Sequence, residues 1–411
     1  MAVYTEPTKE QWQAIAASLG YDTIQWTGES RGTSDTKYVV KLGRKGEEPV
    51  TAMLNIIETP DVNRLGSHAA QAKFLPELLD YIRANSIIYD KSGNKVSFGV
   101  PTPFQFAGHV PYLIMDFPSK GDSRATVKKA IYVVPYIAGK VPLHCDNIPQ
   151  AENYAFRLGQ AHAAWQKAAA GFPEADKLGR TFPVERWPGY AERLRNNPDA
   201  VKKLAARLKE TYQGVGESDA YWNQQAQEHI DKIIDAVAYI TANWQERTKS
   251  LPDQVINGDP FPDNSIVSEH GSLIIVDNGT AERYKNLDIA IGLNAAAMGP
   301  GGKLDMHVAS AYLNGYDSVK PLTPEERRTL EFMGQAAAIR WALYRTLLIA
   351  DTPAGAIVST RVPTAPLQQY EFWHQADKNN ARIADRLLEV KRVKSTANTR
   401  EAALIRGSSF R

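Results

Sequence analysis

Residues 255–294 constrain this chain most, because two polar clusters there each follow a short run of β-branched and aliphatic residues. The run at 254–256 leads to Asp259 and Asn264, and the run at 273–276 leads to Asp277. Such runs predict short buried strands, and the end of a buried strand holds polar side chains in a fixed position. We therefore expect Asp259, Asn264 and Asp277 to converge on one site.

These three side chains form the minimum set of oxygen donors that phosphoryl transfer from a nucleotide requires. An aspartate can orient the attacking hydroxyl, and asparagine and aspartate oxygens are suitable ligands for Mg²⁺. The Asp-x-x-x-x-Asn spacing of Asp259 and Asn264 matches the catalytic loop of the protein-kinase-like fold. Because Asp and Asn are common in turns, a turn or cap role for Asn264 is the alternative interpretation.

A resemblance to a known superfamily is carried by residues 257–264 (NGDPFPDN), 275–277 (IVD) and 287–294 (LDIAIGLN). These segments are similar to the aminoglycoside phosphotransferase and choline kinase superfamily. Within it, the chain is most similar to the ThrB-type homoserine kinases, on the segments at 1–6, 313–316, 320–325, 338–341 and 351–356. The resemblance spans most of positions 1 to about 375.

The resemblance implies an α+β, protein-kinase-like two-lobed fold with a small β-rich N-lobe and a larger, mainly helical C-lobe. Residues 1–135 would form the nucleotide-binding N-lobe, with an insertion near 87–99 that carries a hairpin signal. Residues 136–375 would form the C-lobe with the catalytic loop and the acceptor site. Residues 376–411 carry nine Lys or Arg against four Asp or Glu, which indicates a basic C-terminal tail.

The resemblance also implies that ATP binds to the N-lobe. Gly32, Thr33 and Ser34 lie in the hairpin that covers the phosphates in this fold, where small residues let backbone N–H groups approach. A plain solvent-exposed turn is the alternative interpretation of this segment. The backbone at Val134 and Tyr136, in the expected hinge, would hydrogen-bond an adenine edge.

The lysine that usually grips the phosphates from the third strand is missing, because the resemblance puts Asn55 at that position. Lys41, on the preceding predicted strand, is a candidate substitute. The alternative is an edge-strand lysine that faces solvent.

In the C-lobe, the resemblance assigns each polar residue a role. Asp259 would accept or orient the hydroxyl proton, Asn264 and Asp277 would hold Mg²⁺, and Asp288 would brace the catalytic loop through its backbone. Asn257 stands where a histidine usually precedes Gly-Asp, and its amide can still donate and accept hydrogen bonds.

Arg340 and Arg345 lie on a predicted long helix, and the resemblance suggests that one of them faces the acceptor site. A guanidinium suits a carboxylate such as that of an amino acid, whereas a surface arginine is the alternative. The implied function is ATP-dependent phosphorylation of a hydroxyl of homoserine or a related amino alcohol or amino acid. An aminoglycoside or choline-like acceptor remains open, and so does a catalytically degenerate kinase-like protein that binds a ligand as a regulator.

Composition argues against several other classes. With 48 basic and 46 acidic residues the formal net charge is +2, so no overall field recruits nucleic acid or an anionic membrane. The single cysteine, Cys145, rules out an internal disulfide and suits a reducing compartment. The sequence has no signal-peptide pattern and no apolar run long enough to span a bilayer. We therefore expect a cytoplasmic monomer or homodimer.

Overall fold

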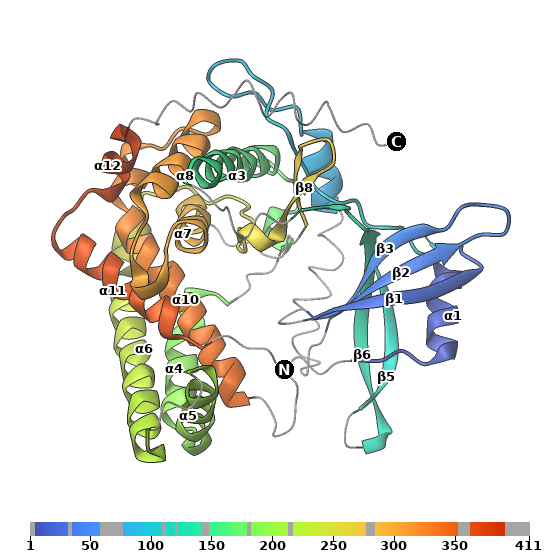
Figure 1. Cartoon of the computed structure of the whole chain (residues 1–411), viewed down its shortest axis with the longest axis horizontal. Helices are drawn as coiled ribbons and strands as arrows, with labels where there is room; N and C mark the ends of the chain where they lie inside the picture. Colours follow the sequence, from blue (N-terminus) through green and yellow to red (C-terminus); the bar gives the residue numbers. More distant parts are fainter. Residues whose placement is uncertain are drawn as a thin grey trace.

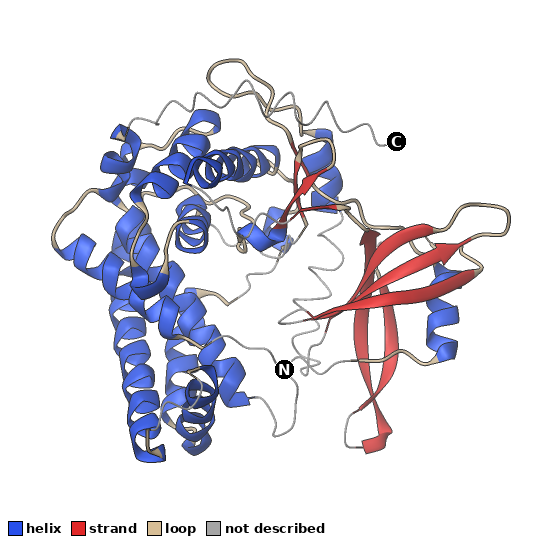
Figure 2. Ribbon diagram, in the orientation of Figure 1, coloured by secondary structure: helices blue, strands red, loops and turns tan. Residues whose placement is uncertain are grey.

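The computed structural model describes residues 5–31, 35–57, 77–108, 110, 112–119, 122–140, 148–178, 182–212, 217–276, 284–351 and 362–390 of the 411-residue chain. The early residues form a β-rich lobe and the later residues form a lobe made mostly of helices (Figures 1 and 2). This arrangement confirms the predicted α+β class with a small β-rich N-lobe and a larger helical C-lobe.

The N-lobe is built on a five-stranded antiparallel sheet in the order β1-β2-β3-β6-β5. Its strands are β1 (Thr23–Arg31), β2 (Asp35–Gly43), β3 (Val50–Ile57), β5 (Leu113–Ser119) and β6 (Asp122–Pro135). Helix α1 (Lys9–Ser18) buries Ile15 against this sheet, in a core that includes Val40, Leu54 and Val133. One face of the sheet is therefore closed by α1.

A second, four-stranded sheet contains β4 (Phe98–Gly99), β7 (Gly139–Lys140), β8 (Ser265–Ser268) and β9 (Leu273–Ile275). Strand β9 confirms the strand that was predicted at 273–276. The prediction of a strand at 254–256 was wrong. These residues pair with no β-strand, although Val255 and Ile256 are buried. Tertiary packing alone buries this aliphatic run, so its burial does not imply that it forms a strand.

The hairpin segment 87–99, which was assigned to the N-lobe as an insertion, packs against the helical lobe. The N–H of Lys91 donates to the carbonyl of Ser318 at 2.8 Å, and the Lys91 ammonium lies 2.7 Å from the Asp317 carboxylate. Ile88 and Val96 belong to the core of the helical lobe. The turn itself is held by Asp90, whose carboxylate accepts two backbone N–H groups.

The helical lobe is organised around two buried helices. Helices α7 (Lys285–Ala296) and α10 (Leu330–Asp351) are apolar on most of their circumference, which is typical of helices covered by others on all sides. Around them lie α3 (Ile148–Ala168), α4 (Trp187–Arg195), α5 (Pro198–Thr211), α6 (Asp219–Thr248), α8 (Met306–Val319), α9 (Pro324–Arg328), α11 (Thr364–Lys378) and α12 (Ile383–Glu389). Among the described helices, none combines the length and apolarity needed to cross a membrane.

Candidate active site

The loop at 257–264 depends on glycine at its second position. Gly258 has a φ of +74°, in the left-handed region that side chains with a Cβ disfavour. The loop then turns tightly, since the N–H of Phe261 donates to the carbonyl of Asp259 at 2.7 Å. It ends in a single 3₁₀ turn, η3 (Pro262–Asn264), directly before β8. This path returns Asn264 to the neighbourhood of Asp259.

Asp259 and Asn264 are in direct contact. The Nδ2 of Asn264 donates to the Asp259 carboxylate Oδ2 at 2.8 Å and to the Asp259 carbonyl at 2.9 Å. The N–H of Asp259 donates to Oδ1 of Asn257 at 3.0 Å, so the residue in the usual histidine position orders the same turn. Because the amide nitrogen of Asn264 faces Asp259, its amide oxygen is the atom that can ligate a cation.

Asp288 on α7 supports this loop from beneath. Its carboxylate accepts the N–H of Asn257 at 2.8 Å and the N–H of Gly258 at 2.6 Å. Burial raises the pKa of Asp288 to about 6, while these hydrogen bonds and the positive charge of Arg340 oppose the increase. These are the contacts that a bracing role for Asp288 requires.

Gln166 on α3 is a further member of this network that the sequence did not reveal. Its Nε2 donates to the Asp288 carboxylate at 2.8 Å, and its Oε1 accepts from Gln254 at 3.0 Å and from the hydroxyl of Tyr316. Gln166 lies 122 positions from Asp288 in the chain. No local pattern could have connected the two residues.

Two groups of predicted site residues lie outside the described residues. They are Asp277, the second expected metal ligand, and the phosphate-covering hairpin residues Gly32, Thr33 and Ser34. Val276, the last described residue before Asp277, donates its N–H to the carbonyl of Asn264 at 2.9 Å. The end of the β9 segment therefore lies beside the Asp259–Asn264 pair.

The predicted hinge contacts need one correction. The N–H of Tyr136 already donates to the carbonyl of Thr51 at 3.1 Å, because β6 continues its pairing with β3, and this donor is not available to an adenine edge. Val134 is paired with Met53 in the same ladder. Contacts of adenine with the hinge backbone stay a prediction.

Asn55, which stands where the third-strand lysine is expected, and Lys41, the candidate substitute, differ in how far they are exposed to solvent. Asn55 on β3 is buried, with an exposed fraction of 3%, and its Nδ2 donates to the carbonyl of Met53 at 3.3 Å. Lys41 on β2 is exposed and lies opposite Thr51.

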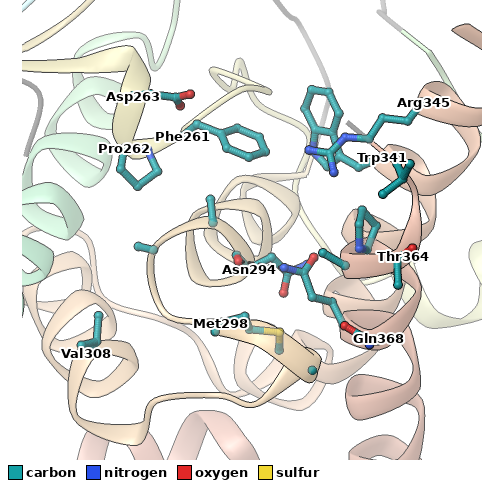
Figure 3. Close-up of a pocket in the computed structure, with 18 of the residues that line it drawn as sticks. Phe261, Pro262, Asp263, Asn294, Met298, Val308, Trp341, Arg345, Thr364 and Gln368 are labelled. Carbon is teal, nitrogen blue, oxygen red and sulfur yellow. Dashed lines mark hydrogen bonds between the residues drawn. The ribbon is translucent and has the colours of Figure 1, made fainter. Parts of the chain in front are cut away.

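A cavity of about 940 Å³ opens next to the loop at 257–264. Three consecutive loop residues line it, Phe261, Pro262 and Asp263, so the cavity wall begins two residues after Asp259. The remaining wall comes mainly from α3, α5, α7, α10 and α11 and from the segment that follows α7. Among the residues labelled in Figure 3, α7, α10 and α11 contribute Asn294, Trp341, Arg345, Thr364 and Gln368. The ring of Phe261 meets the ring of Trp341 edge-on, with centroids 5.1 Å apart.

The two predicted acceptor arginines point to different places. Arg345 lines the cavity, with its guanidinium 5.9 Å from the ring centre of Trp341. Arg340 is buried and donates to the carbonyl of Gly258 at 3.1 Å, so it contacts the loop at 257–264. In Figure 3 the carboxylate of Asp263 and the guanidinium of Arg345 lie on opposite sides of the cavity. No pattern in the sequence identifies Asp263 or Trp341 as wall residues.

The oxygen donors of this loop are compatible with a magnesium ion. The amide oxygen of Asn264, whose Nδ2 is turned to Asp259, is a hard ligand of the type that Mg²⁺ prefers. Within the described part of the chain, no group of three His, Cys, Asp or Glu residues forms a metal site. Asp277, the second expected ligand, lies outside the described residues, so a magnesium site at this loop stays a prediction.

Comparisons with known proteins agree with this geometry. A homoserine kinase of Gluconacetobacter diazotrophicus is 33% identical over 226 residues, which is 54% of this chain and 61% of that protein. One of Rhizobium meliloti is 29% identical over 234 residues, which is 57% of this chain and 62% of that protein. The matched part thus spans about three fifths of the length of these relatives.

A microcompartment-associated aminopropanol kinase has a similar fold, with a TM-score of 0.55 at 12% identity, over 91% of this chain and 99% of that chain. The sequence pattern of the phosphotransferase enzyme family called APH matches residues 28–322. This match includes most of the N-lobe sheet, the loop at 257–264 and Asp288. The chain therefore belongs to the APH phosphotransferase enzyme family.

Proposed function

We propose that this protein is a small-molecule kinase that transfers the γ-phosphoryl group of ATP to a hydroxyl of homoserine or a related amino acid or amino alcohol. The observation that carries the proposal is the contact between Asp259 and Asn264 in a loop braced by Asp288, at the edge of a cavity. Family membership and the two homoserine kinases that the chain resembles support it.

Asp259 would orient the acceptor hydroxyl and take up its proton as the hydroxyl oxygen bonds to the γ-phosphorus. The bond from the γ-phosphorus to the β–γ bridging oxygen breaks, and ADP leaves with that electron pair. Asn264 and Asp277 would hold Mg²⁺, which neutralises phosphate charge when it is bound. The braced loop contributes by positioning, because it fixes Asp259 relative to the phosphate.

Two charged groups of the cavity wall fit an amino acid as acceptor. The guanidinium of Arg345 is suited to a carboxylate, and the carboxylate of Asp263 is suited to an ammonium group. Choline-like alcohols would use only the second of these contacts. An amino acid with a side-chain hydroxyl has the carboxylate that Arg345 is suited to bind, and choline has none, which favours homoserine and its relatives over choline.

An acceptor screen coupled to ADP release tests the proposal. Purified protein with Mg²⁺ and ATP would be offered homoserine, aminopropanol, choline and an aminoglycoside, with each reaction repeated in EDTA. We expect magnesium-dependent ADP release that a hydroxylated amino acid stimulates most. The Glu269→Gln variant, which changes an exposed carboxylate in the β8–β9 turn, should behave as the unmodified chain does.

Two outcomes of this screen would count against the proposal. If only an aminoglycoside or choline stimulates ADP release, the protein is a kinase but the proposed acceptor class is wrong. Binding of ATP without transfer to any of these acceptors would favour a degenerate, ligand-binding member of the family.

A further inference from the structure

The N-lobe sheet has one face that carries the polar residues of β2 and β3. On β2, Tyr38, Val40 and Leu42 are buried in the core shared with α1. Because successive side chains of a strand point to opposite faces, Lys37 and Lys41 lie on the other face. Figure 1 places α1 on the side of the sheet away from the helical lobe, so this second face is turned toward the helical lobe.

The same alternation places Asn55 on that second face. On β3, Ala52, Leu54 and Ile56 are fully buried in the α1 core, which directs Met53 and Asn55 the other way. Asn55 is the position at which the phosphate-gripping lysine is missing. Its amide is neutral, short and bonded to the carbonyl of Met53, so it cannot supply a positive charge.

The register of β2 and β3 puts Lys37 directly opposite Asn55. Cβ atoms of directly opposed residues on one face are about 5 Å apart, and a lysine side chain is long enough to cover that distance. Lys37 is half-buried, whereas Lys41 is exposed. The side chains of Lys37 and Asn55 are therefore neighbours on this face of the sheet.

The ends of the sheet also distinguish the two lysines. Lys41 lies opposite Thr51, and Thr51 accepts the N–H of Tyr136 at the hinge end of β6. Lys37 lies four residues toward the other end, about 13 Å along the strand, next to the Arg31–Thr36 pair that ends the β1–β2 ladder. A nucleotide that lies along β2 with its base at the hinge end and its phosphates toward the other end of the strand would bring its phosphates to Lys37.

We propose that Lys37, from the second strand, supplies the cation that binds the nucleotide phosphates in place of the absent third-strand lysine. This inference depends on the proposed function, because it assumes that the protein binds ATP. It assigns the role to Lys37 rather than to Lys41, and it explains how the chain can tolerate asparagine at position 55.

The test measures binding of Mg²⁺·ATP and of adenosine by calorimetry, without an acceptor. We expect Lys37→Met to raise the dissociation constant for ATP about tenfold or more, as loss of a charge-assisted contact does, with adenosine affinity unchanged. The double variant Lys37→Met/Asn55→Lys should recover ATP affinity, because it moves the cation across one strand pair. Lys45→Met, an exposed lysine in the β2–β3 turn, is the matched control and should bind as the unmodified chain does.

Three results would overturn the assignment. If Lys37→Met binds ATP normally while the unmodified chain also binds it, the assignment is wrong and the proposed function stands. If Lys41→Met shows the phosphate-specific loss instead, the role belongs to Lys41. If the unmodified chain binds no ATP, the proposed function fails and the role of Lys37 fails with it.

Discussion

Gly258 determines the path of the catalytic loop, because its φ of +74° is accessible at low cost only to glycine. We expect Gly258→Ala to lower the free energy of unfolding by about 1–2 kcal/mol, the cost of left-handed backbone for a residue with a Cβ. Turnover should fall as well, because Asp259 follows directly. Urea denaturation and steady-state kinetics on the same preparation would measure both, and an active variant of normal stability would contradict this account of the loop.

Asp288 gives the site a defined pH dependence. Its pKa in the folded protein is about 6, against an ordinary value of 3.8, because burial disfavours the carboxylate. Between these two values the folded protein holds a proton that the unfolded chain releases. The contribution of Asp288 to stability is therefore fully present below pH 3.8 and is lost as the pH rises through 6.

The Asp288→Asn variant has no carboxyl group to titrate at this position, so comparing its unfolding free energy with that of the unmodified chain measures the effect of Asp288. The difference in unfolding free energy between the unmodified chain and Asp288→Asn should fall by roughly 2 kcal/mol from pH 4.5 to 7 and stay constant at higher pH. Turnover of the unmodified chain should change in the opposite direction, because the N–H groups of Asn257 and Gly258 donate to the ionised carboxylate. A difference in stability that does not depend on pH would show that Asp288 does not titrate in this range.

At the scale of elements, α3 and α8 approach each other closely through glycine. A Cβ on Gly159 would lie 2.0 Å from the carbonyl oxygen of Tyr312, and one on Gly315 would lie 2.0 Å from that of Phe156. Both obstacles are backbone atoms, which cannot move without shifting a helix. This contact positions α3, and α3 carries Gln166 to Asp288.

Gly315→Ala should therefore destabilise the protein by roughly 3 kcal/mol, the upper part of the usual range for overpacking. Gly189→Ala in α4 is the matched control, since nothing lies within 4 Å of a Cβ at that exposed helical position. That control should be more stable by about 0.5–1 kcal/mol, because alanine is the better helix former. Thermal or chemical unfolding of the two variants separates the packing effect from helix propensity, and equal effects would refute the close-contact explanation.

Helix α10 contributes to both the loop and the cavity, because its Arg340 contacts the loop at Gly258 and its Arg345 lines the cavity. We expect Arg345→Met to raise the KM of a carboxylate-bearing acceptor about tenfold or more and to leave the KM of ATP unchanged. An acceptor without a carboxylate should be affected little. Equal losses for both acceptor types would mean that Arg345 shapes the cavity without recognising a carboxylate.

Across the whole molecule, the sequence predicted the features that depend on residues close together in the chain. Asp259 and Asn264 are five positions apart, and the N-lobe strands show clear runs and turns, so both could be predicted. The packing of 87–99 on α8 and the contact of Gln166 with Asp288 depend on distant parts of the chain. The strand expected at 254–256 failed for a related reason, since burial there comes from neighbouring elements.

The two lobes divide the proposed reaction between them, with the nucleotide on the N-lobe sheet and the acceptor in the cavity of the helical lobe. Asp259 lies where these two sites would meet, with the cavity wall starting at Phe261. Its replacement by asparagine keeps the size of the side chain and removes only the base. The Asp259→Asn variant should therefore fold and bind nucleotide as the unmodified chain does.

The most direct measurement is transfer of the terminal phosphoryl group from γ-labelled ATP to homoserine, with the unmodified chain and Asp259→Asn compared in the same assay. We expect transfer by the unmodified chain and a loss of about a thousandfold in Asp259→Asn, the scale of a general-base contribution, with ATP affinity unchanged. Near-normal transfer by Asp259→Asn, at equal ATP affinity, would contradict the assignment of this loop as the catalytic centre.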